Sequence, residues 1–432
     1  MAASAGAGAR AAVGAAAVGA VATAAVLAVA ELVAPRRLAP GAAVAAAAAA
    51  ASAAVAWTVV SWASEAVAGQ RGRRDGAVRG VAGLIGNTPL VRIASLSAAT
   101  GCEILAKAEF TSVGGSTKDR VALAIIQDAE ERGLITPNTG CTVFEGTVGS
   151  TGISLAVIAR AKGYLCHIVM PDDQAKEKYE ILEALGATVE RVRPVSIVDK
   201  DHYVNVARRR AEDMNRIADD TGSLARGFFC DQFENLANYR THLSTTGPEI
   251  LAQTRGRIDA FVMGAGTGGT LAGVAHFLKP RVPGLCVVLA DPEGSGLFNK
   301  VMFNVLYASE QAEGKRKRHQ VDTIVEGVGI NRLTAIINLA LDGSIDDAVR
   351  VTDAEAVEMS RFLMREDGLF VGSSSAVNCV AAVRTARKLG PGHTIVTLLC
   401  DHGSRHLTKF WSTEYVARWG LTPSATGLEF LE

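Results

Sequence analysis

Lys118 lies in a run of small residues that could place its amine against a ligand. Residues 114–117 (GGST) precede it, and a helical pattern begins at Asp119. Partial burial at a turn that leads into a helix would lower the pKa of the amine and make it a nucleophile. The alternative is an exposed lysine in a capping turn, with Ser116 or Thr117 as the N-cap.

A glycine-rich segment at residues 264–270 (GAGTGGT) could bind a phosphate group. It follows the apolar run DAFVM and precedes the helical pattern LAGVAHFLK. Glycines let the backbone approach a phosphate closely, and the start of a helix favours negative charge. The segment also fits the GxGxxG pattern of dinucleotide-binding proteins, with Asp291 as the ribose-binding acid. That alternative is weaker, because the motif lies deep in the chain and no hydride-transfer residues accompany it.

Short apolar runs rich in β-branched residues must position these segments. They occupy residues 141–146, 165–171, 258–264, 285–292 and 394–403 and alternate with longer helical patterns such as 119–133 and 177–187. Strands buried between helices read as continuous apolar runs, so we predict an α/β protein with a largely parallel sheet. Ligands bind beyond the carboxyl ends of such strands. The polar segments at 114–120, 145–152, 264–270 and 372–378 are therefore expected to form one small-molecule site.

The composition limits the class of protein. The 432 residues are 49% hydrophobic, which is enough for a sizeable core, and 44 basic residues balance 44 acidic ones. A net charge of zero argues against a nucleic-acid partner. Seven scattered cysteines without metal-ligand spacing predict a reducing compartment and no disulfide framework. We assign no metal, since His402 and His406 alone are weak evidence for one, and we interpret the basic run at 315–319 as a solvated loop.

Residues 1–70 form an alanine-rich segment that differs in composition from the remainder. Residues 11–30 and 41–63 carry no charge, and each stretch is long enough to cross a membrane as a helix. Trp57, Trp62 and the arginines at 71, 73 and 74 suit the end of such a span. We therefore expect a membrane anchor made of one transmembrane helix or a hairpin. A cleaved targeting peptide or a low-complexity segment without a fixed fold are the alternatives.

Six motifs in a fixed order resemble one family of enzymes. They are GLIGNTPLVRI (83–93), GGSTKDR, EGTVGSTG, the QF and TTGPEI segment around Gln232 and Gly247, GAGTGGT and GSSSA. Together they resemble the cysteine synthase and cystathionine β-synthase family of fold-type II pyridoxal-phosphate enzymes, over residues 76–410. The resemblance implies a tryptophan synthase β-like catalytic domain at 71–415 with two α/β lobes, the smaller and mobile one at about 115–245. It also implies a homodimer, and leaves 416–432 as a C-terminal tail.

The same resemblance implies a role for each motif. Lys118 would be the catalytic residue and the Schiff-base lysine of pyridoxal 5′-phosphate. Ser374 would bond to the pyridine nitrogen, and Gln232 would assist the loop that binds the substrate carboxylate. The phosphate would be held by Gly266, Thr267, Gly268, Gly269 and Thr270, and the substrate loop would consist of Thr147, Val148, Gly149 and Thr151.

The substrate loop departs from the family pattern. It usually reads TSGNTG, and its asparagine binds the 3′-oxygen of the cofactor. Here Ser150 occupies that cofactor-binding position, and Val148 replaces a serine. A serine is shorter than an asparagine and has no amide, so the orientation of the substrate or the electronics of the cofactor could differ.

The resemblance implies a β-replacement reaction, in which a thiol or sulfide replaces the leaving group of an amino acid. We expect cysteine synthesis from O-acetyl-L-serine and sulfide, because no haem-binding extension and no regulatory domain is recognised. A cysteine or serine β-lyase and a dehydratase are alternatives, as is a membrane-bound scaffold that has lost catalysis. The alanine-rich extension resembles a divergent fungal branch of the family that is thought to sit on mitochondria.

Overall fold

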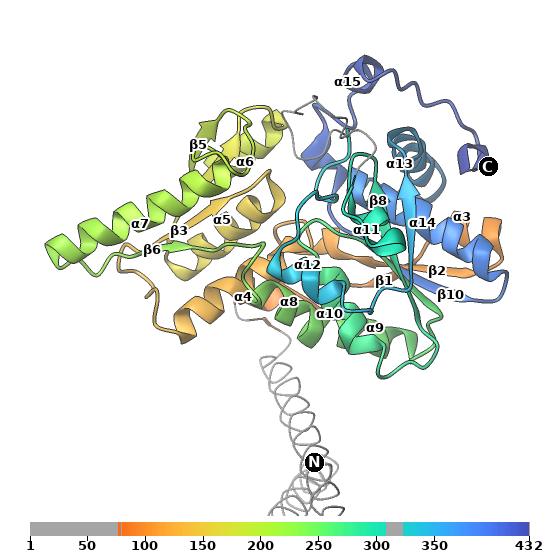
Figure 1. Cartoon of the computed structure of the whole chain (residues 1–432), viewed down its shortest axis with the longest axis horizontal. Coiled ribbons are helices and arrows are strands. Elements are labelled where there is room, and N and C mark those ends of the chain that lie inside the picture. The colour runs from red at the N-terminus through yellow and green to blue at the C-terminus, as the bar shows by residue number, and fades with distance from the viewer. Residues whose placement is uncertain (1–76, 79, 308–322, 432) are drawn as a thin grey trace, which may run out of the picture. The chain divides into compact units, whose positions relative to one another are not determined.

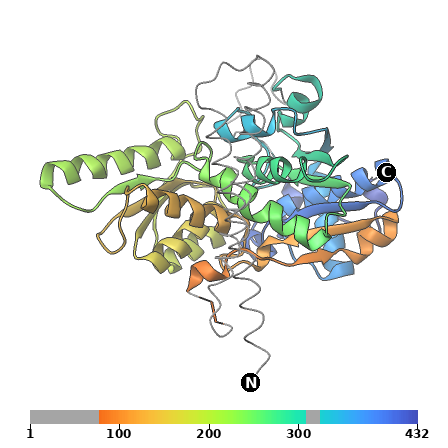
Figure 2. The same ribbon diagram turned by 90° about the horizontal axis from the view of Figure 1, so that it is seen from below.

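Two β-sheets organise the part of the chain that the structure describes, residues 77, 78, 80–307 and 323–431. The structure is a computed structural model, and each sheet with its helices forms one lobe (Figure 1). We call the lobe with the six-stranded sheet the larger lobe and the lobe with the four-stranded sheet the smaller lobe. Viewed from below, the two lobes lie side by side (Figure 2).

The larger lobe has a mainly parallel sheet with helices on both faces. β1 is antiparallel to β2, and the remaining neighbours are parallel. The strand order is β1 (Leu90–Arg92), β2 (Glu103–Ala108), β10 (Thr394–Leu399), β7 (Ala260–Gly264), β8 (Cys286–Pro292) and β9 (Asp347–Val351).

Alternate residues of the central strands enter two different hydrophobic cores. Val262 and Val288 pack with α3 (Ala94–Thr100), α13 (Asp353–Asp367) and α14 (Ser373–Leu389) on one face of the sheet. Phe261 and Val287 pack on the other face with α9 (Gly247–Thr254), α10 (Gly269–Leu278), α11 (Leu297–Phe303) and α12 (Ala335–Ala340). Because both faces are covered, these strands read as nearly continuous apolar runs.

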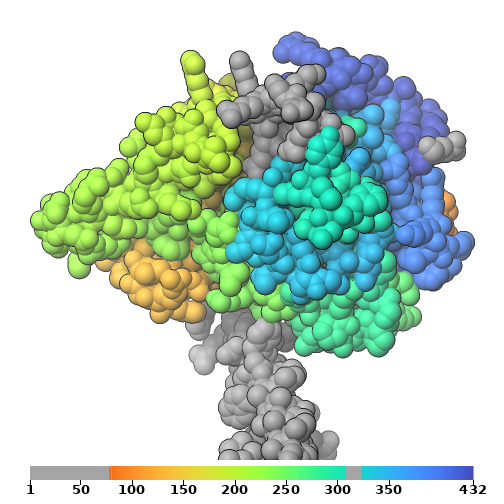
Figure 3. Space-filling model, in the orientation of Figure 1, coloured from red at the N-terminus to blue at the C-terminus, as the bar shows by residue number. Residues whose placement is uncertain are grey.

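The smaller lobe has a fully parallel sheet of four strands in the order β5 (Thr188–Val192), β4 (Leu165–Pro171), β3 (Thr142–Gly146) and β6 (Gly227–Phe229). One face packs against α4 (Lys118–Glu131), α5 (Ser150–Lys162) and α6 (Lys176–Ala184). The other face is covered by α7 (Tyr203–Thr221), a 19-residue helix at the outer edge of this lobe (Figure 3).

Short elements complete the fold. Trp411 and Tyr415 pack against the core of the larger lobe, and so do Leu421 and Leu431 nearer the C-terminus. The short helices are α8 (Ala237–Thr241), α15 (Thr413–Arg418), a π-helical turn at His242–Thr246, and single turns at Val81–Leu84, Glu109–Thr111, Gly403–His406 and Glu429–Leu431.

The predicted α/β architecture with largely parallel sheets is confirmed, and the apolar runs chosen from the sequence are strands β3, β4, β7, β8 and β10. The predicted membrane anchor at residues 1–70 lies outside the described residues, as does the basic run at 315–319. Within the described part of the chain, no helix combines the length and the apolar character that a membrane span needs.

Candidate active site

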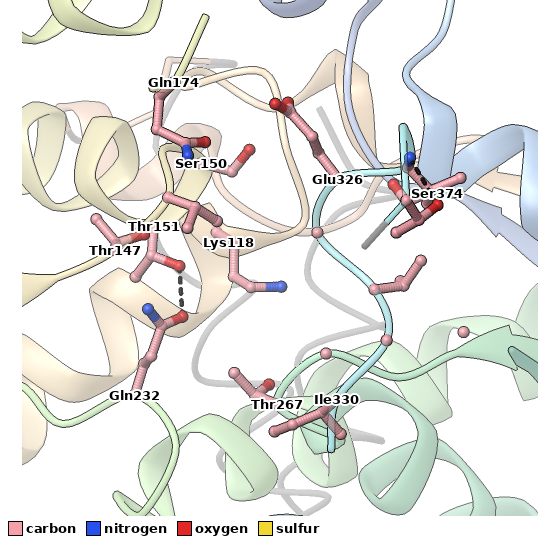
Figure 4. A pocket seen from close by; sticks show the side chains of 18 of the residues that line it. Lys118, Thr147, Ser150, Thr151, Gln174, Gln232, Thr267, Glu326, Ile330 and Ser374 are labelled. Carbon is pink, nitrogen blue, oxygen red and sulfur yellow. Dashed lines mark hydrogen bonds between the residues drawn. The ribbon is translucent and has the colours of Figure 1, made fainter. Parts of the chain in front are cut away.

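A cavity of about 950 Å³ lies where the carboxyl ends of strands from both sheets face each other. Its walls include residues of all four polar segments named in the sequence analysis and residues 323 and 325–332 of the larger lobe. Further lining residues come from 171–178, 194–203, 232–233 and 400–419. Of the predicted site residues, all except Gly149 line the cavity. Figure 4 shows Lys118 reaching toward the centre, with Thr151 and Gln232 on one side and Ser374 on the other.

Lys118 is the first residue of α4 and is partly buried, because its side chain lies on the cavity wall. The turn before it is fixed by the backbone, since the Thr117 amide donates to the Cys400 carbonyl at the end of β10. Burial lowers the pKa of the Lys118 amine, although the nearby Cys400 and Asp401 side chains oppose that change. An amine in this environment gives up its proton more readily than an exposed lysine.

The glycine-rich segment after β7 forms a cradle at the start of α10. Gly268 has a φ of +86°, a conformation that other residues rarely adopt. A Cβ on Gly266 would lie 2.5 Å from the Gly327 carbonyl oxygen, and one on Gly269 would lie 2.1 Å from Asn238 Oδ1. Glycine therefore fits best at these positions, and a helix start of this kind favours an anion.

Two threonines of this cradle are oriented from outside it. Asn238 Nδ2 donates to Thr267 Oγ1 over 3.0 Å, and the ring of His242 bonds to Thr270 Oγ1 over 3.2 Å. Burial, reinforced by Arg120 and Lys118, holds the pKa of His242 well below its ordinary value, so the ring is neutral. Asn238 and His242 were not selected from the sequence, because neither belongs to a recognised phosphate motif.

The substrate loop connects β3 to α5, and its polar side chains form a chain of hydrogen bonds. Thr151 Oγ1 donates to Gln232 Oε1 over 2.6 Å, and Gln232 Nε2 donates to Glu145 Oε1 over 3.1 Å. Burial and the nearby Asp231 raise the pKa of Glu145 to about 8. Glu145 was also missed from the sequence, since a single carboxylate inside an apolar strand has no spacing that marks it.

Ser374 and Ser150 begin helices on opposite lobes. Ser374 lies in the first turn of α14, and its hydroxyl lies close to the side chain of Cys400. Ser150 opens α5, and its hydroxyl donates to Asp401 Oδ2 over 3.4 Å. Ser150 therefore faces a carboxylate of the larger lobe.

Four charged side chains meet at the junction of the lobes beside the substrate loop. Lys178 forms an ion pair with Glu326, His406 Nδ1 lies 3.0 Å from the same carboxylate, and His406 Nε2 lies 2.9 Å from Asp401 Oδ2. Burial alone would lower the pKa of His406, but the carboxylates of Asp401 and Glu326 outweigh it and raise that pKa to about 9. We call these four residues the inter-lobe cluster.

Asp291, the ribose-binding acid of the dinucleotide alternative, is fully buried at the end of β8. Its Oδ2 accepts a hydrogen bond from the Phe298 amide, which fixes the start of α11. It is not among the residues that line the cavity. The acid that this alternative requires therefore has a structural role at the start of α11.

Together these residues suit pyridoxal phosphate. The cradle of Gly266, Gly268 and Gly269 accepts a phosphate, and Lys118 lies in the same cavity with a lowered pKa. Ser374 offers a neutral hydroxyl on the opposite wall. The two-lobed fold and this site define a pyridoxal-phosphate-dependent enzyme of fold type II.

Comparisons with known proteins support the same class of enzyme. The family model described as "Pyridoxal-phosphate dependent enzyme" matches residues 81–401. "Cysteine synthase 2" of Emericella nidulans is 60% identical over 342 residues, which cover 78% of this chain and 80% of that protein. "Putative mitochondrial cysteine synthase" of Saccharomyces cerevisiae is 54% identical, with 77% and 84% covered.

A solved structure, the O-acetylserine dependent cystathionine beta-synthase from Helicobacter pylori, superposes with a TM-score of 0.65 at 29% identity and covers 77% of this chain and 98% of that one. The chain therefore belongs to the cysteine synthase family of pyridoxal-phosphate-dependent enzymes. Its cofactor is pyridoxal 5′-phosphate, and the family expected from the sequence is confirmed.

Proposed function

We propose that this enzyme synthesises cysteine from O-acetyl-L-serine and sulfide and releases acetate. The observation that carries the proposal is the shared cavity, in which the Lys118 amine lies between the phosphate cradle and the substrate loop. The names of the Emericella and Saccharomyces relatives support the choice of product. The small leaving group and sulfide both fit the family's β-replacement chemistry.

The cofactor is assigned to residues that already converge on the cavity. Lys118 would bind it covalently, and Ser374 would bond to its pyridine nitrogen. Ser150 would lie near its 3′-oxygen. The phosphate would bind the backbone amides and hydroxyls of Gly266, Thr267, Gly268, Gly269 and Thr270. When bound, pyridoxal phosphate supplies an electron sink that stabilises negative charge at the substrate Cα.

The protein residues would then handle the carboxylate and the protons. Backbone amides and hydroxyls of Thr147, Val148, Gly149 and Thr151 would bind the α-carboxylate, with Gln232 fixing the Thr151 hydroxyl. The lowered pKa of Lys118 suits the removal of a proton from Cα and its return after the thiol has added at Cβ. The cavity wall formed by the smaller lobe would keep water away from the reacting carbon.

The segment before residue 77 leads to a separate proposal. We propose that residues 1–70 attach the enzyme to a membrane and that the enzyme is mitochondrial. Two uncharged stretches of sufficient length support the attachment. The name of the Saccharomyces relative supports the organelle. We also propose a homodimer, as expected from the family. Gradient fractionation of the full chain would test the membrane attachment and the organelle, and light scattering would test the dimer.

The substrate pair is tested with the full-length holoenzyme. We expect O-acetyl-L-serine alone to change the visible absorption of the bound cofactor, and sulfide to restore the original spectrum while cysteine and acetate accumulate in equal amounts. Lys118→Ala should lower turnover at least about a thousandfold, because it removes both the covalent attachment and the acid–base group. Release of pyruvate and ammonia without cysteine would favour a lyase or dehydratase, and turnover in Lys118→Ala equal to that of the parent would overturn the proposal.

A further inference from the structure

The inter-lobe cluster forms a chain of contacts that begins and ends on the substrate loop. Lys178 Nζ donates to the Val148 carbonyl over 3.2 Å and pairs with Glu326. His406 connects Glu326 to Asp401, and Asp401 accepts the Ser150 hydroxyl. The loop is thus bonded to the cluster on both sides of Gly149.

The cluster crosses from one lobe to the other. Lys178 belongs to α6, which packs with the four-stranded sheet of the smaller lobe. Asp401 follows β10 of the larger lobe, and His406 ends the short turn after it. Contacts beside the cluster reinforce this junction, because Thr408 accepts from the Lys176 amide and donates to Glu177 on the same helix. The position of the substrate loop therefore depends on how α6 meets the larger lobe.

The stem of Lys178 also shapes the loop backbone. Gly149 has a φ of +142°, and a Cβ at this position would lie 2.5 Å from Lys178 Cδ. The stem of Lys178 thus packs against Gly149, while its ammonium donates to the carbonyl of Val148. A conformation that only glycine adopts readily is held in place by a buried side chain from a neighbouring helix.

The charges of the cluster balance within a nearly closed space. The side chains of Lys178 and His406 are only 2% and 3% exposed, and those of Asp401 and Glu326 are 8% and 14% exposed. Two cations and two anions are therefore held together, and Lys409 lies 3.7 Å from Glu326 at the rim. Removing one member leaves a buried charge without its partner, which is costly. The cluster therefore favours one defined arrangement of the lobes and the loop.

We propose that Lys178, through Glu326, His406 and Asp401, is a positioning residue that sets the substrate loop in the geometry that binds the α-carboxylate of the amino acid. This inference rests on the proposed function only in taking residues 147–151 as the carboxylate site. Lys178 lines the cavity, but its ammonium is directed to the Val148 carbonyl and to Glu326, so its role is to position the loop. Its loss is expected to weaken the binding of amino acids and to leave the attachment of the cofactor to Lys118 intact.

The test measures amino-acid binding in the holoenzyme by the change in cofactor absorption on titration with L-serine and O-acetyl-L-serine. In Lys178→Met, we expect the dissociation constants for both to rise about tenfold or more, as for the loss of one charged hydrogen bond. The KM for O-acetyl-L-serine should rise by more than kcat falls. The absorption of the cofactor without amino acid should equal that of the parent.

Glu326→Gln is a second variant, because it keeps the shape and the acceptor for Lys178 while it removes one charge. His406 then loses one of its two carboxylates and keeps Asp401, while the charge of Lys178 still opposes its own. We expect amino-acid binding to weaken. Because Glu326 helps to raise the pKa of His406, we also expect His406 to lose its proton at a lower pH, so that binding fails at a lower alkaline pH than in the parent. The double variant should bind amino acids no more weakly than the more affected of the two single variants, because both changes break the same chain of contacts.

Lys176→Met is the matched control, since Lys176 lies on the same helix but pairs with Glu180 on the exposed surface. Its binding constants should equal those of the parent. If the parent holoenzyme responds to neither amino acid, the carboxylate site itself is wrong and the proposed function fails. If the parent responds and both Lys178→Met and Glu326→Gln bind amino acids as tightly as Lys176→Met, the positioning role alone is overturned. Loss of amino-acid binding only in proportion to loss of bound cofactor would overturn it too.

Discussion

At the scale of single residues, the orientation of the Gln232 amide depends on Glu145. Gln232 accepts from Thr151 through Oε1 and donates to Glu145 through Nε2, so a carbonyl or carboxylate oxygen must occupy the Glu145 position. With a pKa of about 8, Glu145 is mostly protonated at neutral pH, and its second oxygen has no hydrogen-bond partner among the described residues. A neutral amide would serve the same purpose.

Glu145→Gln is therefore expected to keep activity near neutral pH and to gain stability relative to the parent as the pH rises. The folded protein holds the Glu145 proton up to about pH 8, whereas the unfolded chain releases it near the ordinary value of 4.5. The folded state binds more protons between these values, so the parent loses stability across that window. The difference in melting temperature between variant and parent should grow from about pH 4.5 to about pH 8 and then level off.

Thermal unfolding of the holoenzyme over this pH range measures the effect. Glu183→Gln provides a control, because Glu183 pairs with Arg191 on the exposed surface. A difference in melting temperature that does not change with pH would show that folding does not raise the pKa of Glu145.

The residues that the sequence made recognisable are those that lie in short motifs. Lys118, Thr267 and Ser374 each sit beside glycines or small residues in a polar run that follows an apolar one. The members of the inter-lobe cluster carry no such signal, since Lys178 and Glu326 are 148 residues apart and meet only because the lobes face each other. His406 was noticed from the sequence only as a weak metal ligand, and its pairing with Asp401 and Glu326 depends on tertiary packing.

At the scale of elements, the cofactor site depends on the turn between β7 and α10. The turn lies against residues 327–328 of the larger lobe, and a Cβ at Gly266 would point at the Gly327 carbonyl oxygen. Backbone atoms cannot rotate away as a flexible side chain can. Either the turn or the 325–330 segment must therefore move to accept any larger residue.

Gly266→Ala is expected to weaken the binding of pyridoxal phosphate at least about tenfold, because displaced amides lose charge-assisted hydrogen bonds to the phosphate. Cofactor titration of the apoenzyme, followed by protein fluorescence, measures the dissociation constant. Gly343→Ala is the control, since Gly343 has a φ of +99° and open space around it, so it tests strain alone. Equal cofactor affinity in both variants would contradict the role of the Gly266 turn.

The elements that sequence patterns predicted best are the strands buried on both faces. β7 and β8 read as continuous apolar runs because α10 and α14 cover opposite sides of the sheet. β9 (Asp347–Val351) escaped notice, because this edge strand is only partly buried and its sequence DAVRV mixes charged and apolar residues. The division of the strands between two sheets also could not be read from periodicity, since it depends on which strands pair.

At the scale of the whole molecule, buried charges join the lobes in two places. One is the inter-lobe cluster, and the other surrounds Arg120 in the first turn of α4. Arg120 Nε lies 2.8 Å from Glu109 Oε2 and its Nη1 lies 2.7 Å from Glu249 Oε1, and Lys107 Nζ lies 2.7 Å from Glu249 Oε2. Because α4 packs with the smaller lobe while Lys107 and Glu249 belong to β2 and α9 of the larger lobe, these pairs fix the helix that carries Lys118.

Glu249→Gln should lower the free energy of unfolding by about 3 kcal/mol at neutral pH, because Arg120 and Lys107 lose a shared buried anion. Burial alone would raise the pKa of Glu249, but Arg120 and Lys107 outweigh it and lower that pKa to about 2. The stability that this charge provides is therefore complete above about pH 4.5, the ordinary value, and is lost as the pH falls toward 2. In denaturant unfolding of the holoenzyme, the difference in the free energy of unfolding between parent and variant should shrink over this range.

Glu180→Gln is the control. It breaks only an exposed pair with Lys176 and should change the free energy of unfolding by less than about 0.5 kcal/mol at any of these pH values. An equally small effect of Glu249→Gln would mean that the Arg120 junction contributes little to holding the lobes together.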